Sequence, residues 1–233
     1  MNFRDIPYHV RRAMGRHDPL LLREQGFLKR KTFGQFVKQF LPPPGVLGAD
    51  GLFYQDTREP FIGTDIAAVT LAATNKALYP ASNFPVLGGQ YFSRIGKKLH
   101  IVLFGRMTTG ATPGNLTLGV YYGTGADANG VLLVSSAAVA MVATQTNISW
   151  NLDIMVHCRS LGSAGTLFAC GIFQCGAAVI ASTAQPVMIP ASAPVVSGAC
   201  DLTAANIISL QALRSGSTAE TMQVHDMKVV AVN

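Results

Sequence analysis

The sequence predicts an all-β protein: an antiparallel jelly-roll sandwich that follows an extended, partly helical N-terminal arm. Three observations lead to this prediction. Apolar and polar residues alternate with a period of two in several segments of residues 45–233. Turn residues separate these segments at short intervals, without a convincing helical pattern between them. Finally, the whole net charge of +6 lies in residues 1–44.

The charge distribution divides the chain into two parts. Residues 1–44 contain nine Lys or Arg and three Asp or Glu, whereas residues 45–233 contain nine of each kind. The run Pro42-Pro43-Pro44 closes the basic segment, because proline cannot continue a helix. The sequence therefore predicts a basic, Phe-rich arm over 1–44 and a β-sandwich domain over 45–233.

Two helices are expected in the arm. Asp18 followed by Pro19 is a good helix start, although Gly26 weakens the stretch that follows. Thr32 and Gln35 have the spacing of a capping box. Behind them, one apolar stripe of a short helix comprises Phe33, Phe36, Val37 and Phe40.

The strands of the body follow from alternation and from turn signals. They are predicted at about 69–73, 99–103, 116–122, 131–142, 150–159, 166–173, 207–213 and 221–231. Asn129-Gly130 predicts a hairpin. In the last strand the apolar phase slips at His225-Asp226, which predicts a β-bulge. An up-and-down barrel is disfavoured, because several connections are long.

The composition favours assembly over an isolated monomer. Charged residues make up 13% of the chain and hydrophobic residues 49%. An ordinary soluble domain is about 25% charged, so other subunits are expected to cover much of this surface. The basic start is not followed by an apolar segment with a cleavage site, and the tract from Val131 to Ala143 is too short to span a bilayer. Synthesis in the cytoplasm without membrane insertion is expected.

None of the histidines, cysteines or carboxylates of the body has a spacing that predicts catalysis. His157 and Cys158 are adjacent in a strand and point to opposite faces, so they cannot act on one atom. His100 lies in an apolar strand, where a satisfied structural histidine is the favoured interpretation. His225 and Asp226 could approach each other at a bulge, but a loop hydrogen bond explains the pair as well as a catalytic role does. The segment GTGADANG contains one carboxylate, Asp127, and lacks the helix that a phosphate site needs. We expect no enzyme activity, no cofactor and no metal.

The four cysteines also lack metal-type spacing. They are expected to be reduced and mostly buried, as small hydrophobic side chains: Cys158, Cys170, Cys175 and Cys200.

Three interpretations of the arm compete. It could fold back on its own body with its charges in solvent, or neutralise nucleic-acid phosphates. In the third interpretation it becomes ordered on a neighbouring protein, with aromatic side chains as anchors and Arg as hydrogen-bond donor. The interleaved aromatic residues favour the third, because a disordered polyelectrolyte has no use for so much aromatic area. The residues expected to bind the partner are Arg11, Arg12, Arg16, Arg23, Lys29, Arg30, Phe33, Phe36 and Phe40.

The run between Gly88 and Phe173 carries a resemblance to a known group. It contains GQYFSRIGKKLHIVLFGRMTTGATPGNLTLGVYYGTG and then W-x-L-x-x-x-V-x-C-R-S-x-G-x-x-G-T-L, and the chain ends with ISLQALRSGSTAETMQVHDMKVVAVN. Together these segments resemble the jelly-roll virion proteins of tailed bacteriophages, of the head decoration, cement or head-fibre type. The resemblance implies a non-enzymatic virion component, commonly trimeric, that sits on the capsid.

The functional expectation combines the resemblance with the arm. We expect a decoration or cement protein that binds the major capsid protein through its arm and associates with itself as a homotrimer. Nucleic acid is a disfavoured partner. Two alternatives stay open: a shell-forming coat protein whose arm binds nucleic acid, and a virion jelly roll that binds a receptor or carbohydrate.

Overall fold

The computed structural model describes residues 65–89, 91–176, 186–193 and 195–232, together with the backbone of two short strands, 21–24 and 27–30. The chain divides into two compact units, Met1–Pro44 and Gly45–Asn233, which are described separately below. Within the described residues, no helix is long and apolar enough to cross a membrane.

The described part of the first unit is a pair of antiparallel strands rather than a helix. β1 spans Leu21–Glu24 and β2 spans Phe27–Arg30, with Leu21 opposite Arg30. The helix expected after Asp18-Pro19 is therefore wrong over these residues. A glycine in a helix interior costs about 1 kcal/mol relative to alanine, and Gly26 lies between the two strands. The second expected helix, over 32–40, lies outside the described residues.

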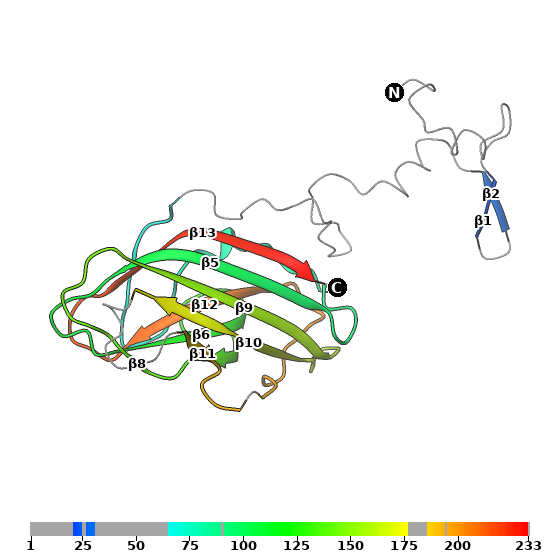
Figure 1. The fold of residues 1–233 in the computed structure, drawn as a ribbon. Helices are drawn as coiled ribbons and strands as arrows, with labels where there is room; N and C mark the ends of the chain where they lie inside the picture. The colour runs from blue at the N-terminus through cyan, green and yellow to red at the C-terminus, as the bar shows by residue number, and fades with distance from the viewer. Residues whose placement is uncertain are drawn as a thin grey trace, which may run out of the picture. The chain divides into compact units, whose positions relative to one another are not determined.

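The first layer of the second unit is a six-stranded antiparallel sheet (Figure 1). Its strand order is β11-β10-β9-β5-β13-β3. The strands are β3 (Val69–Thr70), β5 (Lys98–Thr108), β9 (Ile148–Ser160), β10 (Thr166–Cys175), β11 (Val187–Ile189) and β13 (Thr221–Val232).

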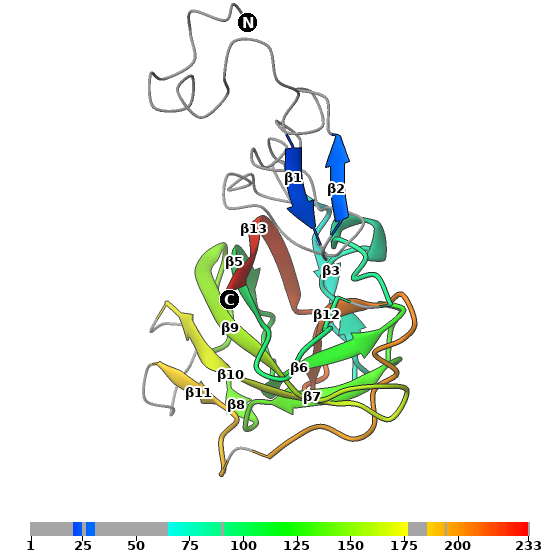
Figure 2. The same ribbon diagram turned by 90° about the vertical axis from the view of Figure 1, so that its right-hand side faces the viewer.

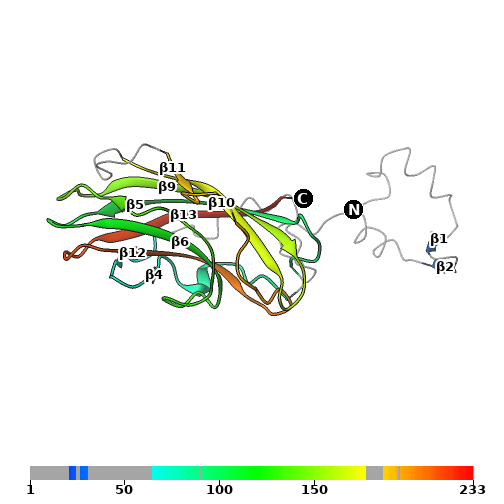
Figure 3. The same ribbon diagram turned by 90° about the horizontal axis from the view of Figure 1, so that it is seen from below.

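The second layer is a five-stranded antiparallel sheet in the order β4-β12-β6-β7, with β8 also paired to β6. Its strands are β4 (Lys76–Ala77), β6 (Asn115–Gly123), β7 (Val131–Ser135), β8 (Val139–Ala140) and β12 (Ile207–Arg214). Figure 2 shows the two sheets as separate layers, and in Figure 3 β9, β5 and β13 lie above β6 and β12. The predicted two-sheet antiparallel architecture is confirmed.

The core lies between the layers and follows the predicted alternation. In β9 the buried positions are Trp150, Leu152, Ile154, Val156 and Cys158, and the residues between them are half-buried or exposed. β5 shows the same alternation from Leu99 to Met107. Each buried aliphatic or aromatic side chain contributes about 1.5–3 kcal/mol to folding. The period-two pattern thus positions the core side of each long strand.

β12 departs from simple alternation, because all of Ile207–Ala212 is buried. The β6–β7 connection, residues 124–130, covers the outer side of this strand. Nε2 of Gln211 donates hydrogen bonds to the carbonyl oxygens of Ala126, at 3.2 Å, and Asn129, at 2.9 Å. A polar residue is buried here because the backbone of a folded loop provides acceptors for its amide.

The predicted bulge and hairpin are both present. The register between β13 and β5 shifts between Val224 and Asp226, so His225 has no partner in the ladder. β6 and β7 form an antiparallel pair that the connection with Asn129-Gly130 joins. Gly130 has a φ of 103°, and its N–H donates to Oδ1 of Asn129 at 2.7 Å. This left-handed turn conformation is one that glycine adopts without strain.

The strand expected over 131–142 is interrupted. β7 ends at Ser135 and β8 begins at Val139, and both pair with β6. The side chain of Ser136 explains the break, since its Oγ accepts from the N–H of Leu118 at 3.0 Å and donates to the carbonyl of Ala137 at 2.7 Å. A buried hydroxyl thus replaces part of the ladder. β4, β11 and a 3₁₀ turn over Ala81–Asn83 were not predicted.

Candidate functional site

The residues that the sequence nominates for partner binding all belong to the first unit. Arg23 lies in β1 opposite Leu28, and Lys29 lies in β2 opposite Leu22. Arg30, the last residue of β2, is opposite Leu21. The antiparallel register therefore brings these three cationic positions into one short ladder. The other nominated residues lie outside the described ones: Arg11, Arg12, Arg16, Phe33, Phe36 and Phe40.

In the second unit, a cationic cluster lies on the outer side of the six-stranded sheet. Lys98 of β5 is directly opposite His157 of β9. The guanidinium of Arg159 lies 4.8 Å from the centre of the Phe168 ring, and the His157 ring meets the same phenyl edge-on at 5.7 Å. The pKa of His157 is lowered below its usual value of 6.5. The largest cause is partial burial, and the charges of Lys98 and Arg159 add to it. The body is neutral as a whole but locally positive here.

A small pocket opens farther along the same sheet. It has a volume of about 310 Å³, and its lining includes Phe104, Asn151 and Gln174. Phe104 is 49% exposed and lies opposite Asn151, which in turn lies opposite Gln174 in the register of the sheet. One aromatic ring and two neutral amides in a row can bind an uncharged polar ligand through ring contact and hydrogen bonds.

His100 is a satisfied histidine, as the sequence analysis favoured. Its Nε2 lies 2.8 Å from Oδ1 of Asp153 on the neighbouring strand β9, and both side chains are part-buried. His225 is paired as well, but with a carboxylate remote in sequence. Its Nδ1 lies 2.5 Å from Oδ1 of Asp65. The bulge therefore directs His225 to the segment that precedes β3 instead of to Asp226.

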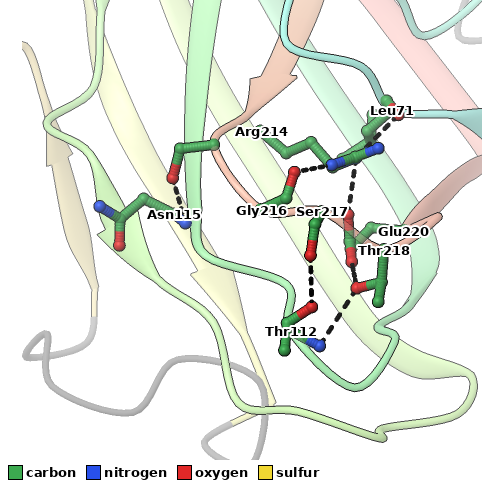
Figure 4. A network of polar contacts seen from close by, with 9 residues as sticks. Leu71, Thr112, Asn115, Arg214, Gly216, Ser217, Thr218 and Glu220 are labelled. Atoms are coloured by element: carbon green, nitrogen blue, oxygen red, sulfur yellow. Dashed lines mark hydrogen bonds and ion pairs between the residues drawn. The ribbon is translucent and has the colours of Figure 1, made fainter.

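A network of polar contacts surrounds a buried ion pair that the sequence analysis did not identify (Figure 4). Nε of Arg214 lies 2.7 Å from Oε2 of Glu220, whose side chain is completely buried. The same Nε lies 3.0 Å from the carbonyl of Leu71, and Arg214 also donates to the carbonyl of Gly216. The hydroxyl of Thr218 donates to the second carboxylate oxygen of Glu220. The buried carboxylate of Glu220 thus has an opposite charge beside it inside the protein.

The same network joins two loops at one end of the sandwich. The hydroxyls of Thr112 and Ser217 lie 2.7 Å apart, and the N–H of Asn115 donates to Oγ of Ser215 at 2.9 Å. Figure 4 shows these contacts beside the ion pair, and Leu71 lies on its far side. The loop before β6 is thereby fixed to the β12–β13 connection. This cluster is structural in form, since each contact joins groups of the protein itself.

The GTGADANG segment is confirmed as a hairpin connection, and its carboxylate is engaged. Oδ2 of Asp127 lies 2.7 Å from Nζ of Lys76, and its Oδ1 accepts from the N–H of Ala77 at 2.8 Å. The hydrogen bond from Lys76 and then that from Ala77 lower the pKa of Asp127 below 3.8. The loop is thus anchored to β4.

Burial of the cysteines agrees with their predicted role as small hydrophobes. Cys158, Cys175 and Cys200 are buried, and Cys170 is half-buried. Burial raises the pKa of the Cys158 and Cys200 thiols, and it raises that of Cys175 to about 11. Within the described residues, no group of three or more His, Cys, Asp or Glu lies close enough to hold a metal ion.

A hollow lined by aliphatic and serine side chains lies between β7 and the segment after β11. Its volume is about 290 Å³, and its lining includes Leu132, Pro190, Val195 and Val196. Leu132, Val195 and Val196 are 43%, 73% and 51% exposed, so these side chains present considerable apolar area to solvent. Large exposed apolar surfaces on soluble proteins commonly mark interaction sites.

Comparison with family models and with curated proteins finds no match. Among solved structures, a legume lectin-like domain from Entamoeba histolytica is similar at 8% sequence identity, over 74% of this chain and 89% of that chain. The TM-score of this match is 0.26.

Proposed function

We propose that this protein is a non-enzymatic structural component of a bacteriophage particle, a decoration or cement protein that binds the major capsid protein through its N-terminal arm. In this proposal the sandwich is of jelly-roll type and forms a homotrimer. The arm extends along neighbouring capsid subunits, pairs its Arg and Lys side chains with acidic groups, and inserts its Phe side chains between subunits.

The observation that carries the proposal is the division of the chain into a cationic unit and a neutral one. The whole net charge of +6 precedes Gly45, where the second compact unit begins. Three arms on one trimer would bind cooperatively, because the first contact raises the local concentration of the other two arms. A neutral scaffold with a cationic attachment segment suits that task.

The polar groups of the sandwich support a scaffold role. Each ion pair described above joins two segments of the same body: Arg214–Glu220, Lys76–Asp127, His100–Asp153 and His225–Asp65. Arg214–Glu220 holds the β12–β13 connection, and Lys76–Asp127 fixes the loop that covers β12. These side chains therefore serve the fold, and the arm is left to supply the attachment.

A second candidate function, binding of a receptor or carbohydrate, is favoured by the pocket at Phe104. An exposed ring next to Asn151 and Gln174 could contact the apolar face of a sugar while the amides bind its hydroxyls. Titration with neutral oligosaccharides tests this function. Trp150 lines the same pocket, so its fluorescence reports binding. Loss of any response in Phe104→Ala would assign the signal to the pocket.

The test of the main proposal removes the arm. A chain without residues 1–41 should remain a folded oligomer and should no longer bind empty heads, as imaged by electron microscopy. Lys228→Glu, which reverses one exposed charge on the body, serves as a matched control and should bind normally. Decoration of heads at full occupancy by the truncated protein would show that the arm is not the attachment device.

A further inference from the structure

The charged residues of the sandwich are unevenly distributed along the sequence. Residues 128–152 contain no Asp, Glu, Lys or Arg, and neither do residues 160–200. Between them lie Asp153 and Arg159 in β9. Residues 45–233 contain 18 charged residues in 189, so at that average the two stretches would contain about two and about four charged residues. We therefore expect these stretches to lie where charged side chains would be energetically unfavourable.

The fold brings a part of each uncharged stretch to one side of the sandwich. The first contains β7, which ends the described strand order of the five-stranded sheet, and the second contains β11, which ends that of the six-stranded sheet. β10, the neighbour of β11, contacts β7 across the two layers. We define the neutral edge as β7, β11 and the segments 190–193 and 195–198.

The neutral edge also concentrates exposed apolar side chains. Eight large hydrophobic side chains are exposed in the described part of the chain, and four belong to this edge: Leu132, Met188, Val195 and Val196. Leu132, Val195 and Val196 line the hollow of about 290 Å³ between β7 and the segment after β11, and Met188 lies in β11 itself. The surface therefore combines exposed apolar area, a concave shape and a lack of charge, as the centre of a protein interface does.

The opposite side of the sandwich has shorter edge strands and carries charged residues. There the sheets end in β3 and β4, each of two residues. Lys76 of β4 forms an ion pair with Asp127, and Asp65, which pairs with His225, precedes β3. Short strands and charged residues protect sheet edges from association. The neutral edge has a five-residue strand, β7, and no charged side chain.

We propose that the neutral edge is the surface through which copies of this chain contact one another. The proposal deepens the proposed function, because it assigns the contact surface of the homotrimer assumed there. A charged partner would lose hydration at this surface without gaining an opposite charge. A second copy presents a surface equally free of charge, so that no charge is left unpaired on either side.

The geometry suits side-chain packing rather than addition of a strand. β11 is only three residues long and is flanked by Pro186 and Pro190, which lack the N–H that a new strand would need. β7 and the 190–198 segment are two neighbouring surfaces on one side. In a cyclic oligomer, β7 of one copy packs against the 190–198 segment of the next, and repetition closes the ring.

The experiment measures the mass of the full-length chain by sedimentation velocity over a range of concentrations. The edge variants are Val195→Glu and Leu132→Glu, and the matched control is Ile95→Glu, which is 66% exposed and lies outside the neutral edge. The wild type and the control should associate equally. Each edge variant should raise the dissociation constant more than about a hundredfold, because association would bury an unpaired charge.

A second measurement covers the case in which an edge variant folds poorly. In a mixture of two single variants, a Leu132→Cys chain and a Val195→Cys chain should form a disulfide with each other on mild oxidation, and Ile95→Cys chains should not form one. A monomeric wild type, wild-type association by folded edge variants, or equal cross-linking of Ile95→Cys would overturn the proposal. Failure of the arm proposal gives a different result, because removal of residues 1–41 tests attachment to heads and should leave the number of subunits in the oligomer unchanged.

Discussion

Arg214 and Glu220 form an ion pair at the point where the chain passes from β12 to β13, with Nε 2.7 Å from Oε2. Glu220 is completely buried, and its backbone carbonyl accepts from the N–H of Leu71 at 2.8 Å. Arg214 in turn contacts the carbonyl of Leu71. A single charged pair therefore joins the β12–β13 connection to the segment after β3.

Removal of one partner of this pair should strongly destabilise the protein. We expect Arg214→Met to lower the free energy of unfolding by about 3–5 kcal/mol, because the carboxylate of Glu220 would be left buried and unpaired. Urea unfolding followed by Trp fluorescence measures the change. The double variant Arg214→Met/Glu220→Leu removes both charges and should recover much of the loss. A single variant as stable as the double variant would contradict this account.

The Lys76–Asp127 pair should produce a small dependence of stability on pH. The pKa of Asp127 is lowered in the folded protein, so its stabilising contribution is complete above the unfolded value of 3.8 and is lost as pH falls through the folded pKa. The carboxylate is 48% exposed, so the contribution should stay below about 1 kcal/mol. Unfolding curves of wild type and Asp127→Asn should converge as the pH falls well below 3.8. If the free energies of unfolding of the two proteins differed by the same amount at every pH, ionisation of Asp127 would not be the cause of the difference.

The pKa of His157 should respond to its cationic neighbours. Lys98 and Arg159 lower this pKa by disfavouring the protonated ring, so Lys98→Gln and Arg159→Gln should each raise it. Histidine titration by NMR measures the value directly. Lys228→Gln removes a charge from another position of the sheet, opposite Val102, and should leave the pKa of His157 unchanged. An equal shift in all three variants would indicate a general effect of net charge.

Cysteine reactivity should follow burial. Cys170 is half-buried, whereas burial raises the pKa of the thiols of Cys158, Cys175 and Cys200. Because the thiolate is the reactive form, iodoacetamide at pH 8 should label Cys170 first in the folded protein. Peptide mass spectrometry locates the label, and Cys170→Ser should abolish this early modification. Rapid labelling of Cys175 would contradict the predicted protection.

The long strands could be predicted because their signal is local. Alternation of apolar and polar residues defines the buried face of β9 from Trp150 to Cys158, whichever strands become its neighbours. The bulge at His225 was predictable for the same reason, since one extra residue reverses the alternation within the strand itself. Asn129-Gly130 likewise marks a turn by its own backbone preference.

The short strands and the split of the 131–142 segment depend on distant partners. β4 and β11 pair over two and three residues, too few for a periodic pattern to be detected. β12 is buried on both faces because residues 124–130 fold over it. The sequence of β12 alone does not predict that this loop covers it. In the arm, two four-residue strands pair where a helix was expected, because a glycine-interrupted segment has only a weak helix preference.

The charged constellations show the same division. Nothing in the sequence around Glu220 or Asp65 identifies a partner for either carboxylate. The fold places Glu220 beside Arg214 and Asp65 beside His225. The nominated arm residues were found from composition, a local property that identifies candidates without specifying contacts. Composition also revealed the uncharged stretches, whereas sheet order was needed to show that β7 and β11 lie on one side.

Charge content and period-two alternation are properties of neighbouring residues, and they were enough to predict a β-rich body that follows a cationic segment. The identity of the edge strands, the burial of particular acids and the grouping of exposed apolar residues emerged only from the folded structure. These outcomes depend on pairing between residues far apart in the chain, and such contacts form only after the intervening chain has closed into a loop.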